Sequence, residues 1–341
     1  MRKYLLLVVG LAMLVTPVLV AGCATPTPEL GSAERPVKLM FVPSVDVAVI
    51  EESGQAMADW ITEKTEIHFD VSVPVSYAAT IEAMCAAEGD SMAFIPGLGY
   101  VLANDKCDVQ VALATIRYGR TAYWTEFVTL RDSGITSIAD LEGKKWAVPS
   151  VTSTSGYLYP SVLLQMEGIT PGETVEAGGH PQAVLAVLDG TADFATCFFS
   201  PPGDAVEDWS EGDPPEPGGE FTIEQQDDGS YEVWQGGLMI RDARVAAMAT
   251  NPAAVEDVAI IGLSEHIPND TVSFVSDFPA EMRETIVQAL IDYAATEEGH
   301  AVLANADFYD ITGFGPVDDS YYDPVRNAIN TLGWTEEDIL E

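Results

Sequence analysis

The most informative stretch of the chain is Thr152-Ser153-Thr154-Ser155-Gly156-Tyr157-Leu158-Tyr159-Pro160, which directly follows a short apolar strand predicted at 146–149. Its hydroxyl groups stand where a helix is predicted to begin. The N-terminus of a helix leaves about four backbone N–H groups without partners and carries about half a positive charge. Hydroxyl donors at the same place complete a neutral site for a tetrahedral oxyanion. An ordinary helix cap is the simpler interpretation of such a run, so other features of the chain must decide.

The composition is strongly acidic. The 341 residues include 54 Asp and Glu against 15 Lys and Arg, which gives a formal net charge of −39. Nucleic-acid binding is excluded as a function class, because it requires a basic face. The same charge repels small anions, so an anion site in this chain must depend on local donors.

The N-terminus predicts export and lipid anchoring. Arg2-Lys3 precede an apolar run at 4–20, and Val20-Ala21-Gly22-Cys23 follows, as in a bacterial lipoprotein signal. We therefore expect residues 1–22 to be removed, Cys23 to carry the lipid, and residues 23–36 to form a flexible tether rich in Pro, Thr and Glu. The protein would then be extracytoplasmic and held on the cell membrane. A plain transmembrane anchor is the alternative, because the apolar run is nearly long enough to span a bilayer. Pro17 and the small residues before the predicted cleavage site argue against it.

Strands and helices alternate along the rest of the chain, which predicts βαβ units and parallel sheets. We expect an α/β protein with two doubly wound lobes, joined by two crossing segments, and a ligand cleft between them. The first lobe takes residues 37–118 and 275–341, and the second takes 119–274 with an acidic surface insertion at 201–237. Ligands of such sheets bind beyond the C-terminal ends of the strands.

Three cysteines follow Cys23, which allows at most one internal disulfide. Cys85 falls near the end of one predicted helix of the first lobe, and Cys107 falls just after the next. Both should lie at the same end of that lobe, so we predict a Cys85–Cys107 disulfide, with Cys197 buried and reduced.

Enzyme signatures and metal-site spacings are lacking in the sequence. It contains no Gly-x-Ser-x-Gly elbow, and its four histidines are scattered at 68, 180, 266 and 300. We expect a binding protein, with no catalytic residues, no metal and no cofactor.

Over residues 37–335 the chain resembles the substrate-binding proteins of phosphate, phosphite and phosphonate ABC importers, within the two-lobed type II periplasmic binding proteins. The resemblance is carried by 153–160, by Gly179-His180 with 186–190 and Asp193, and by Ile267-Pro268-Asn269-Asp270. It implies a monomer that captures such an oxyanion and delivers it to an ABC permease.

The resemblance also implies a set of ligand-binding positions at strand ends and helix starts: Tyr77, Tyr123, Ser153, Thr154, Ser155, His180 and Asp270. The three hydroxyls and the imidazole match groups that hold phosphonate oxygens, the two tyrosines line the cleft, and Asp270 faces the amino end of aminoalkylphosphonates. A companion carboxylate falls on Ser200, which weakens the case for an aminoalkyl ligand. From the residues alone, His180 could equally cap the helix behind Pro181, and Asp270 could be a turn residue.

Two other functions remain open at this level. The same fold binds other small ligands, such as a sulfonate or a vitamin precursor. An extracytoplasmic sensor domain would bind the same oxyanion without transporting it. If the protein is a carrier, ligand binding should close the lobes about hinges near 119–124 and 270–275.

Overall fold

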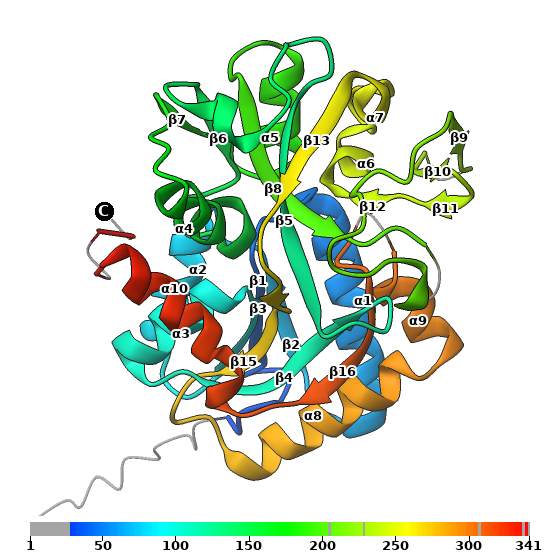
Figure 1. Cartoon of the computed structure of the whole chain (residues 1–341). Coiled ribbons are helices and arrows are strands. Elements are labelled where there is room, and N and C mark those ends of the chain that lie inside the picture. The colour runs from blue at the N-terminus through cyan, green and yellow to red at the C-terminus, as the bar shows by residue number, and fades with distance from the viewer. Residues whose placement is uncertain (1–27, 204–205, 228, 306–307, 336–337, 340–341) are drawn as a thin grey trace, which may run out of the picture.

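The computed structural model describes residues 28–341 except 204–205, 228, 306–307, 336–337 and 340–341. The predicted signal peptide and the lipidation site Cys23 lie outside the described residues. In the described part of the chain, no helix is both long and apolar enough to cross a membrane. Two α/β lobes lie one above the other in Figure 1.

A mixed six-stranded sheet forms the first lobe, in the order β16-β4-β15-β3-β1-β2. Its strands are β1 (Val37–Phe41), β2 (Phe69–Ser72), β3 (Ser91–Ile95), β4 (Gln110–Arg117), β15 (Thr271–Phe274) and β16 (Ile311–Pro316). Its helices are α1 (Val47–Thr65), α2 (Tyr77–Cys85), α3 (Gly97–Cys107), α8 (Ala280–Ala294) and α9 (Glu297–Leu303). Strands β2, β1 and β3 run parallel, as the alternating pattern predicts, whereas β15 runs antiparallel to β3.

The main strands of the second lobe follow the order β13-β5-β8-β6-β7, with β12 and β14 paired at its margins. Its strands are β5 (Ala122–Leu130), β6 (Trp146–Val148), β7 (Thr174–Glu176), β8 (Phe194–Ser200), β12 (Arg241–Asp242), β13 (Val258–Leu263) and β14 (Ile267–Pro268). Its helical segments are η1 (Ile138–Leu141), η2 (Thr154–Leu158), α4 (Tyr159–Met166), α5 (His180–Leu188), α6 (Ala243–Ala247) and α7 (Ala254–Asp257).

The acidic insertion is more firmly attached than a surface loop. After the short turn η3 (Val206–Asp208) it forms a small sheet of β9 (Phe221–Gln225), β10 (Tyr231–Gln235) and β11 (Leu238–Met239). Trp209 is buried, and its ring packs against Trp124 and Phe199 of the second lobe. Glu216 forms ion pairs with Arg131 and with the fully buried Arg244. The insertion therefore contributes to the core, although its composition predicts only surface.

The C-terminal end of the predicted tether is packed, contrary to the sequence prediction. Gly31 and Arg35 close a turn by a 2.8 Å backbone hydrogen bond, and the N–H of His68 donates to the carbonyl of Gly31. Leu30 packs on the core of the first lobe. The one large aliphatic side chain in this polar segment finds a contact, so any tether ends before about residue 29.

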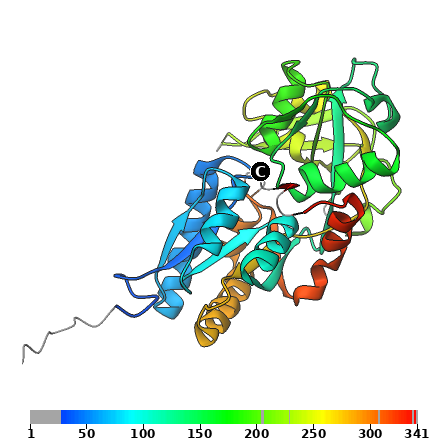
Figure 2. The same cartoon turned by 90° about the vertical axis from the view of Figure 1, so that its left-hand side faces the viewer.

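The lobes meet at the predicted crossings and at one place that was not predicted. The chain crosses between β4 and β5, and again between β14 and β15, where Thr271 already pairs in the first sheet. The predicted boundary at residue 275 is therefore four residues late. In addition, α10 (Asp323–Leu332), which follows η4 (Asp319–Tyr322), packs on α3 of the first lobe and α4 of the second. Figure 2 shows this red helix beside the junction.

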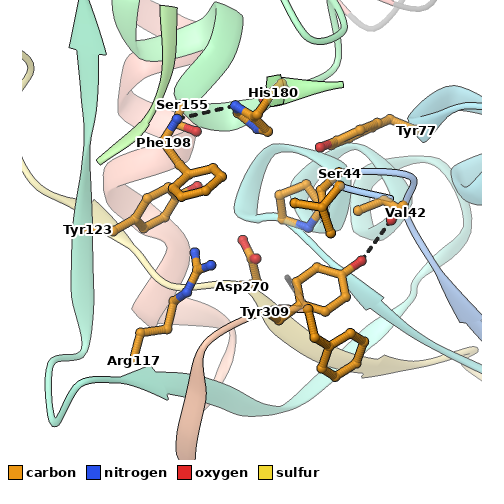
Figure 3. A pocket seen from close by; sticks show the side chains of 14 residues that line it. Val42, Ser44, Tyr77, Arg117, Tyr123, Ser155, His180, Phe198, Asp270 and Tyr309 are labelled. Carbon is orange, nitrogen blue, oxygen red and sulfur yellow. Dashed lines mark hydrogen bonds between the residues drawn. The ribbon is translucent and has the colours of Figure 1, made fainter. Parts of the chain in front are cut away.

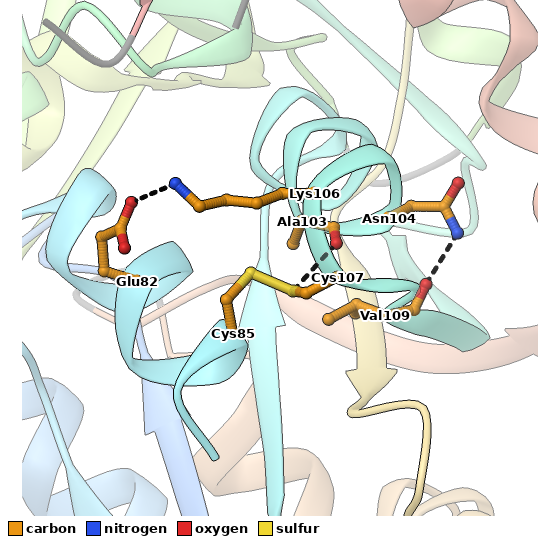
Figure 4. Close-up of a disulfide and its surroundings, with 7 residues drawn as sticks. All are labelled: Glu82, Cys85, Ala103, Asn104, Lys106, Cys107 and Val109. Atoms are coloured by element: carbon orange, nitrogen blue, oxygen red, sulfur yellow. Dashed lines mark hydrogen bonds and ion pairs between the residues drawn. A yellow bond between two sulfur atoms is a disulfide. The ribbon is translucent and has the colours of Figure 1, made fainter. Parts of the chain in front are cut away.

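The predicted disulfide is present. Cys85 at the end of α2 and Cys107 at the end of α3 are bonded, with their Cα atoms 5.4 Å apart, and Cys197 is buried and free. An ion pair between Lys106 and Glu82 lies beside the bond and ties the same two helices (Figure 4).

Candidate ligand-binding site

A small cavity of about 30 Å³ lies between the lobes and is lined by both. Its walls contain Val42, Ser44, Val45, Tyr77, Pro96, Arg117, Tyr123, Ser153, Ser155, His180, Phe198, Asp270, Phe308 and Tyr309. Six of the seven predicted ligand-binding residues are in this set (Figure 3 labels most of the wall). Thr154 is the exception.

The hydroxyl run forms one wall of the cavity, as a π-helical turn that leads into α4. Ser153 caps this turn, because its Oγ accepts a 3.0 Å hydrogen bond from the N–H of Gly156. Gly156 packs so closely on Pro149 that a Cβ there would clash. Pro160 falls in the first turn of α4, and the carbonyls of Ser155 and Gly156 one turn before it accept hydrogen bonds from the hydroxyls of Thr125 and Thr196, so its missing N–H is tolerated. The turn therefore presents Ser153 and Ser155 to the cavity in a fixed position.

His180 presents a neutral N–H donor to the same wall. It is the first residue of α5, and its Nδ1 accepts a 3.2 Å hydrogen bond from the N–H of Phe198 (Figure 3). Burial, with a smaller effect from nearby Arg117, lowers the pKa of His180 to about 3. A neutral imidazole that accepts at Nδ1 carries its proton at Nε2. The side chain does not cap its own helix, which was the alternative role for it.

Thr154 is turned away from the cavity. Its Oγ1 accepts a 2.8 Å hydrogen bond from the N–H of Leu98, near the start of α3 in the first lobe. Helix α3 begins after Pro96, which has no capping side chain, so a residue of the other lobe caps it. The sequence predicts that the hydroxyls of Ser153, Thr154 and Ser155 play the same role. In the structure the hydroxyl of Thr154 instead binds the backbone of the other lobe.

The first lobe and the crossings supply the opposite wall. Burial raises the pKa of Tyr77 and of Tyr123, so both phenols stay protonated. The carboxylate of Asp270 also faces the cavity, and burial raises its pKa while Arg117 opposes that shift. Ser200, where the resemblance places a second carboxylate, is not part of the cavity wall, and Phe198 lines it from the same strand.

Arg117, Ser44 and Tyr309 line the cavity but were missed by the sequence analysis. Arg117 ends β4 at the first crossing and is 7% exposed. Tyr309 is held by a 2.7 Å hydrogen bond from its hydroxyl to the carbonyl of Val42 (Figure 3). A cation next to a predicted hinge, in a chain with so few basic residues, was a signal for Arg117. Ser44 stands just beyond the C-terminal end of a predicted strand, where such sheets bind ligands, whereas no local pattern marks Tyr309.

The lobes are hydrogen-bonded to each other around the cavity. The N–H of His180 donates to the carbonyl of Ser44 at 3.3 Å, and the N–H of Leu98 donates to Thr154. Residues at the starts of α2, α3, η2 and α5 line the cavity, so the partial positive charge of these helix ends lies close to it. Among the described residues, no group of three or more His, Cys, Asp or Glu side chains could hold a metal ion.

Two α/β lobes closed over a small polar cavity define a two-lobed ligand-binding protein. The sequence model of the family described as "ABC transporter, phosphonate, periplasmic substrate-binding protein" matches residues 39–322, which is most of the chain. The chain therefore belongs to this family of extracytoplasmic substrate-binding proteins, which are not enzymes.

Individual relatives are distant. The phosphate-import protein PhnD of Mycolicibacterium smegmatis is 24% identical over 176 residues, which cover 48% of this chain and 54% of that protein. The match thus spans about half the length of this curated relative. A binding-protein component of an ABC phosphonate transporter from Pseudomonas aeruginosa superposes with a TM-score of 0.67 at 17% identity, covering 87% of each chain.

PhnD1 from Prochlorococcus marinus, in complex with methylphosphonate, gives a TM-score of 0.64 at 13% identity and covers 87% of this chain and 98% of that one. At these identities, the solved structures establish the two-lobed fold and not the ligand.

Proposed function

We propose that the protein captures a small phosphorus oxyanion, such as phosphate, phosphite or a phosphonate, and delivers it to an ABC importer. The observation that carries this proposal is the cavity itself. Two serines and a neutral imidazole line it, together with residues at four helix starts from both lobes. Such donors bind an anion by hydrogen bonds and partial charges, and they remain effective in a protein whose overall charge is negative.

The location of the protein is part of the same proposal. The family is extracytoplasmic, and the lipoprotein-like sequence before residue 24 supports a lipid anchor on Cys23. Mass spectrometry of the membrane-extracted protein should find the lipid on an N-terminal Cys23. Recovery of Cys23→Ala in the membrane fraction at the wild-type level would reject this anchor.

The ligand class is tested by calorimetry with phosphate, phosphite, methylphosphonate, 2-aminoethylphosphonate, sulfate and a simple sulfonate. We expect binding of at least one phosphorus oxyanion. The variant Ser153→Ala/Ser155→Ala should bind it at least about 100-fold more weakly, because two charge-assisted hydrogen bonds are lost and each contributes about 1.5–3 kcal/mol.

The matched control is Ser161→Ala. Ser161 lies on α4, its hydroxyl donates to the carbonyl of Tyr157, and it does not line the cavity. Its affinity should equal that of the wild type. Binding of the sulfonate alone, or equal losses in the control and the double variant, would reject the proposed function.

A further inference from the structure

Arg117 places a buried positive charge at the cavity. Its guanidinium lies over the rings of Phe198 and Tyr123, with its carbon 5.3 and 5.9 Å from the two ring centres. Figure 3 shows it entering from the first crossing, opposite the wall formed by Ser155 and His180. The side chain therefore points toward the space that a ligand held by that wall would occupy.

The protein itself satisfies this guanidinium poorly. Its nearest carboxylate oxygen, on Asp310, is 3.7 Å from Nη2, which is too long for a hydrogen bond, and Asp310 is shared with the hydroxyl of Tyr118. Within the described chain, Nε of Arg117 has no hydrogen-bond partner. A buried charge with unused donors is costly, so an acceptor supplied by the ligand would compensate for its burial.

Charge balance in the cavity wall points to the kind of ligand. Arg117 and Asp270 are the two ionisable groups of opposite charge in this wall, and they interact electrostatically. An aminoalkylphosphonate would bring an ammonium group to a carboxylate that already has a cation beside it, and Arg117 would repel that ammonium. A ligand without an amino group meets no such repulsion.

Cavity size points the same way. A cavity needs about 10–15 Å³ by this measure to hold one water, so about 30 Å³ admits only a compact ligand. Phosphate, phosphite and methylphosphonate are compact, whereas 2-aminoethylphosphonate carries a longer tail.

We propose that Arg117 binds the ligand directly and makes the site selective for small tetrahedral oxyanions without a cationic tail, an inference that rests on the proposed function. Arg117 donates to the anionic oxygens from the first crossing while the serines and His180 donate from the second lobe. Asp270 then interacts with Arg117 electrostatically, without a contact ion pair, and has no ligand ammonium to bind.

The experiment compares wild type, Arg117→Gln, Arg117→Lys and Arg120→Gln in calorimetry with phosphate, methylphosphonate and 2-aminoethylphosphonate. Wild type should prefer the better of the first two ligands over the aminoalkyl compound by at least about tenfold. Arg117→Gln should bind the preferred ligand about 100-fold more weakly, as expected for the loss of a charged, hydrogen-bonded partner. The preference over 2-aminoethylphosphonate should shrink at the same time, because Asp270 becomes available to the ammonium.

Arg117→Lys keeps the charge but not the planar fork, and should lose about tenfold. If circular dichroism shows that Arg117→Gln is unfolded, the affinity of Arg117→Lys tests whether Arg117 binds the ligand. Arg120→Gln is the matched control: it removes one charge from the same turn, but Arg120 donates to the carbonyl of Trp209 and does not line the cavity. Its affinity should change less than about threefold, a range typical of a screened surface charge.

Two results would overturn the inference while leaving the proposed function intact. One is an unchanged affinity in the folded Arg117 variants, and the other is a wild-type preference for 2-aminoethylphosphonate. If wild type binds no phosphorus oxyanion, the proposed function fails and this inference fails with it.

Discussion

At the scale of single residues, the site combines neutral donors with one charge. His180 is the clearest neutral donor, because the N–H of Phe198 occupies Nδ1 and leaves the proton on Nε2. Its lowered pKa means that the imidazole is uncharged across the physiological range. The strength of this donor should therefore not depend on pH where an ordinary histidine titrates.

His180 also links stability to pH. The folded-state pKa is below the unfolded value of about 6.5, so its contribution to stability is fully present above pH 6.5 and is lost as pH falls toward about 3. On going from pH 7 to roughly pH 4.5, wild type should lose about 2 kcal/mol more unfolding free energy than His180→Gln does. Urea unfolding at both pH values measures this difference. The exposed His266→Gln is the control, and a His180→Gln curve parallel to that of wild type would show that the imidazole is not held neutral.

At the scale of elements, one lobe completes a helix of the other. The hydroxyl of Thr154 caps α3 across the interface, at the N–H of Leu98. The cap can exist only while the lobes are together, so its energy is available only to the closed form. Thr154 as a direct ligand contact remains a prediction from the family resemblance.

We predict that Thr154→Val weakens ligand binding about 3- to 30-fold, because losing a helix cap costs about 0.5–2 kcal/mol. Thr154→Ser keeps the hydroxyl and should bind like wild type. Calorimetry with the best ligand compares the two. A loss in Thr154→Ser with none in Thr154→Val would mean that packing of the methyl group, and not the cap, holds this position.

The disulfide joins two helices at a site that does not line the cavity. Its removal in Cys85→Ala/Cys107→Ala should lower the unfolding free energy by about 3 kcal/mol, as the closure of a loop of this length predicts. Ligand affinity should be unchanged. Urea unfolding and calorimetry on the same preparation separate the two effects, and a large loss of affinity would contradict a purely stabilising bond.

Local patterns in the sequence predict much of the fold and most of the candidate site. Alternating apolar strands and helices indicate two lobes, and the hydroxyl run and His180 are marked by helix starts. Ser44 lies at a predicted strand end, which is where such sheets bind ligands. The position of Tyr309 depends on how distant segments meet, which no local pattern encodes. Likewise, α10 has the spacing of an ordinary surface helix, and nothing in that spacing says that it touches both lobes.

At the scale of the whole molecule, the structure is in a closed arrangement. The N–H of His180 donates to the carbonyl of Ser44 across the lobes, and the N–H of Leu98 donates to the side chain of Thr154. Helix α10 spans the junction, and Trp334 just beyond it stacks on Tyr157 of the second lobe, with the ring centres 5.1 Å apart. Opening must bend the two crossings and also break or carry along this third contact. The two lobes are thus joined by the two crossings and also by α10, a connection that the sequence did not reveal.

Ligand binding should shift the molecule toward this closed arrangement, since groups of both lobes touch the cavity. Small-angle scattering should give a smaller radius of gyration with saturating ligand than without it. The variant Ser153→Ala/Ser155→Ala, at the same ligand concentration, should keep the larger value. Identical curves for wild type with and without ligand, with binding shown separately, would favour a rigid sensor over a carrier that closes.

The position of the cavity between the lobes has a consequence for timing. A bound ion there contacts walls from both lobes, which also hydrogen-bond to each other, so we expect it to leave when the lobes part. Ions that make stronger contacts with both lobes should then leave more slowly, because those contacts must break before the lobes part. A transporter that pulls the lobes apart would thereby set the moment of release, whatever the cargo.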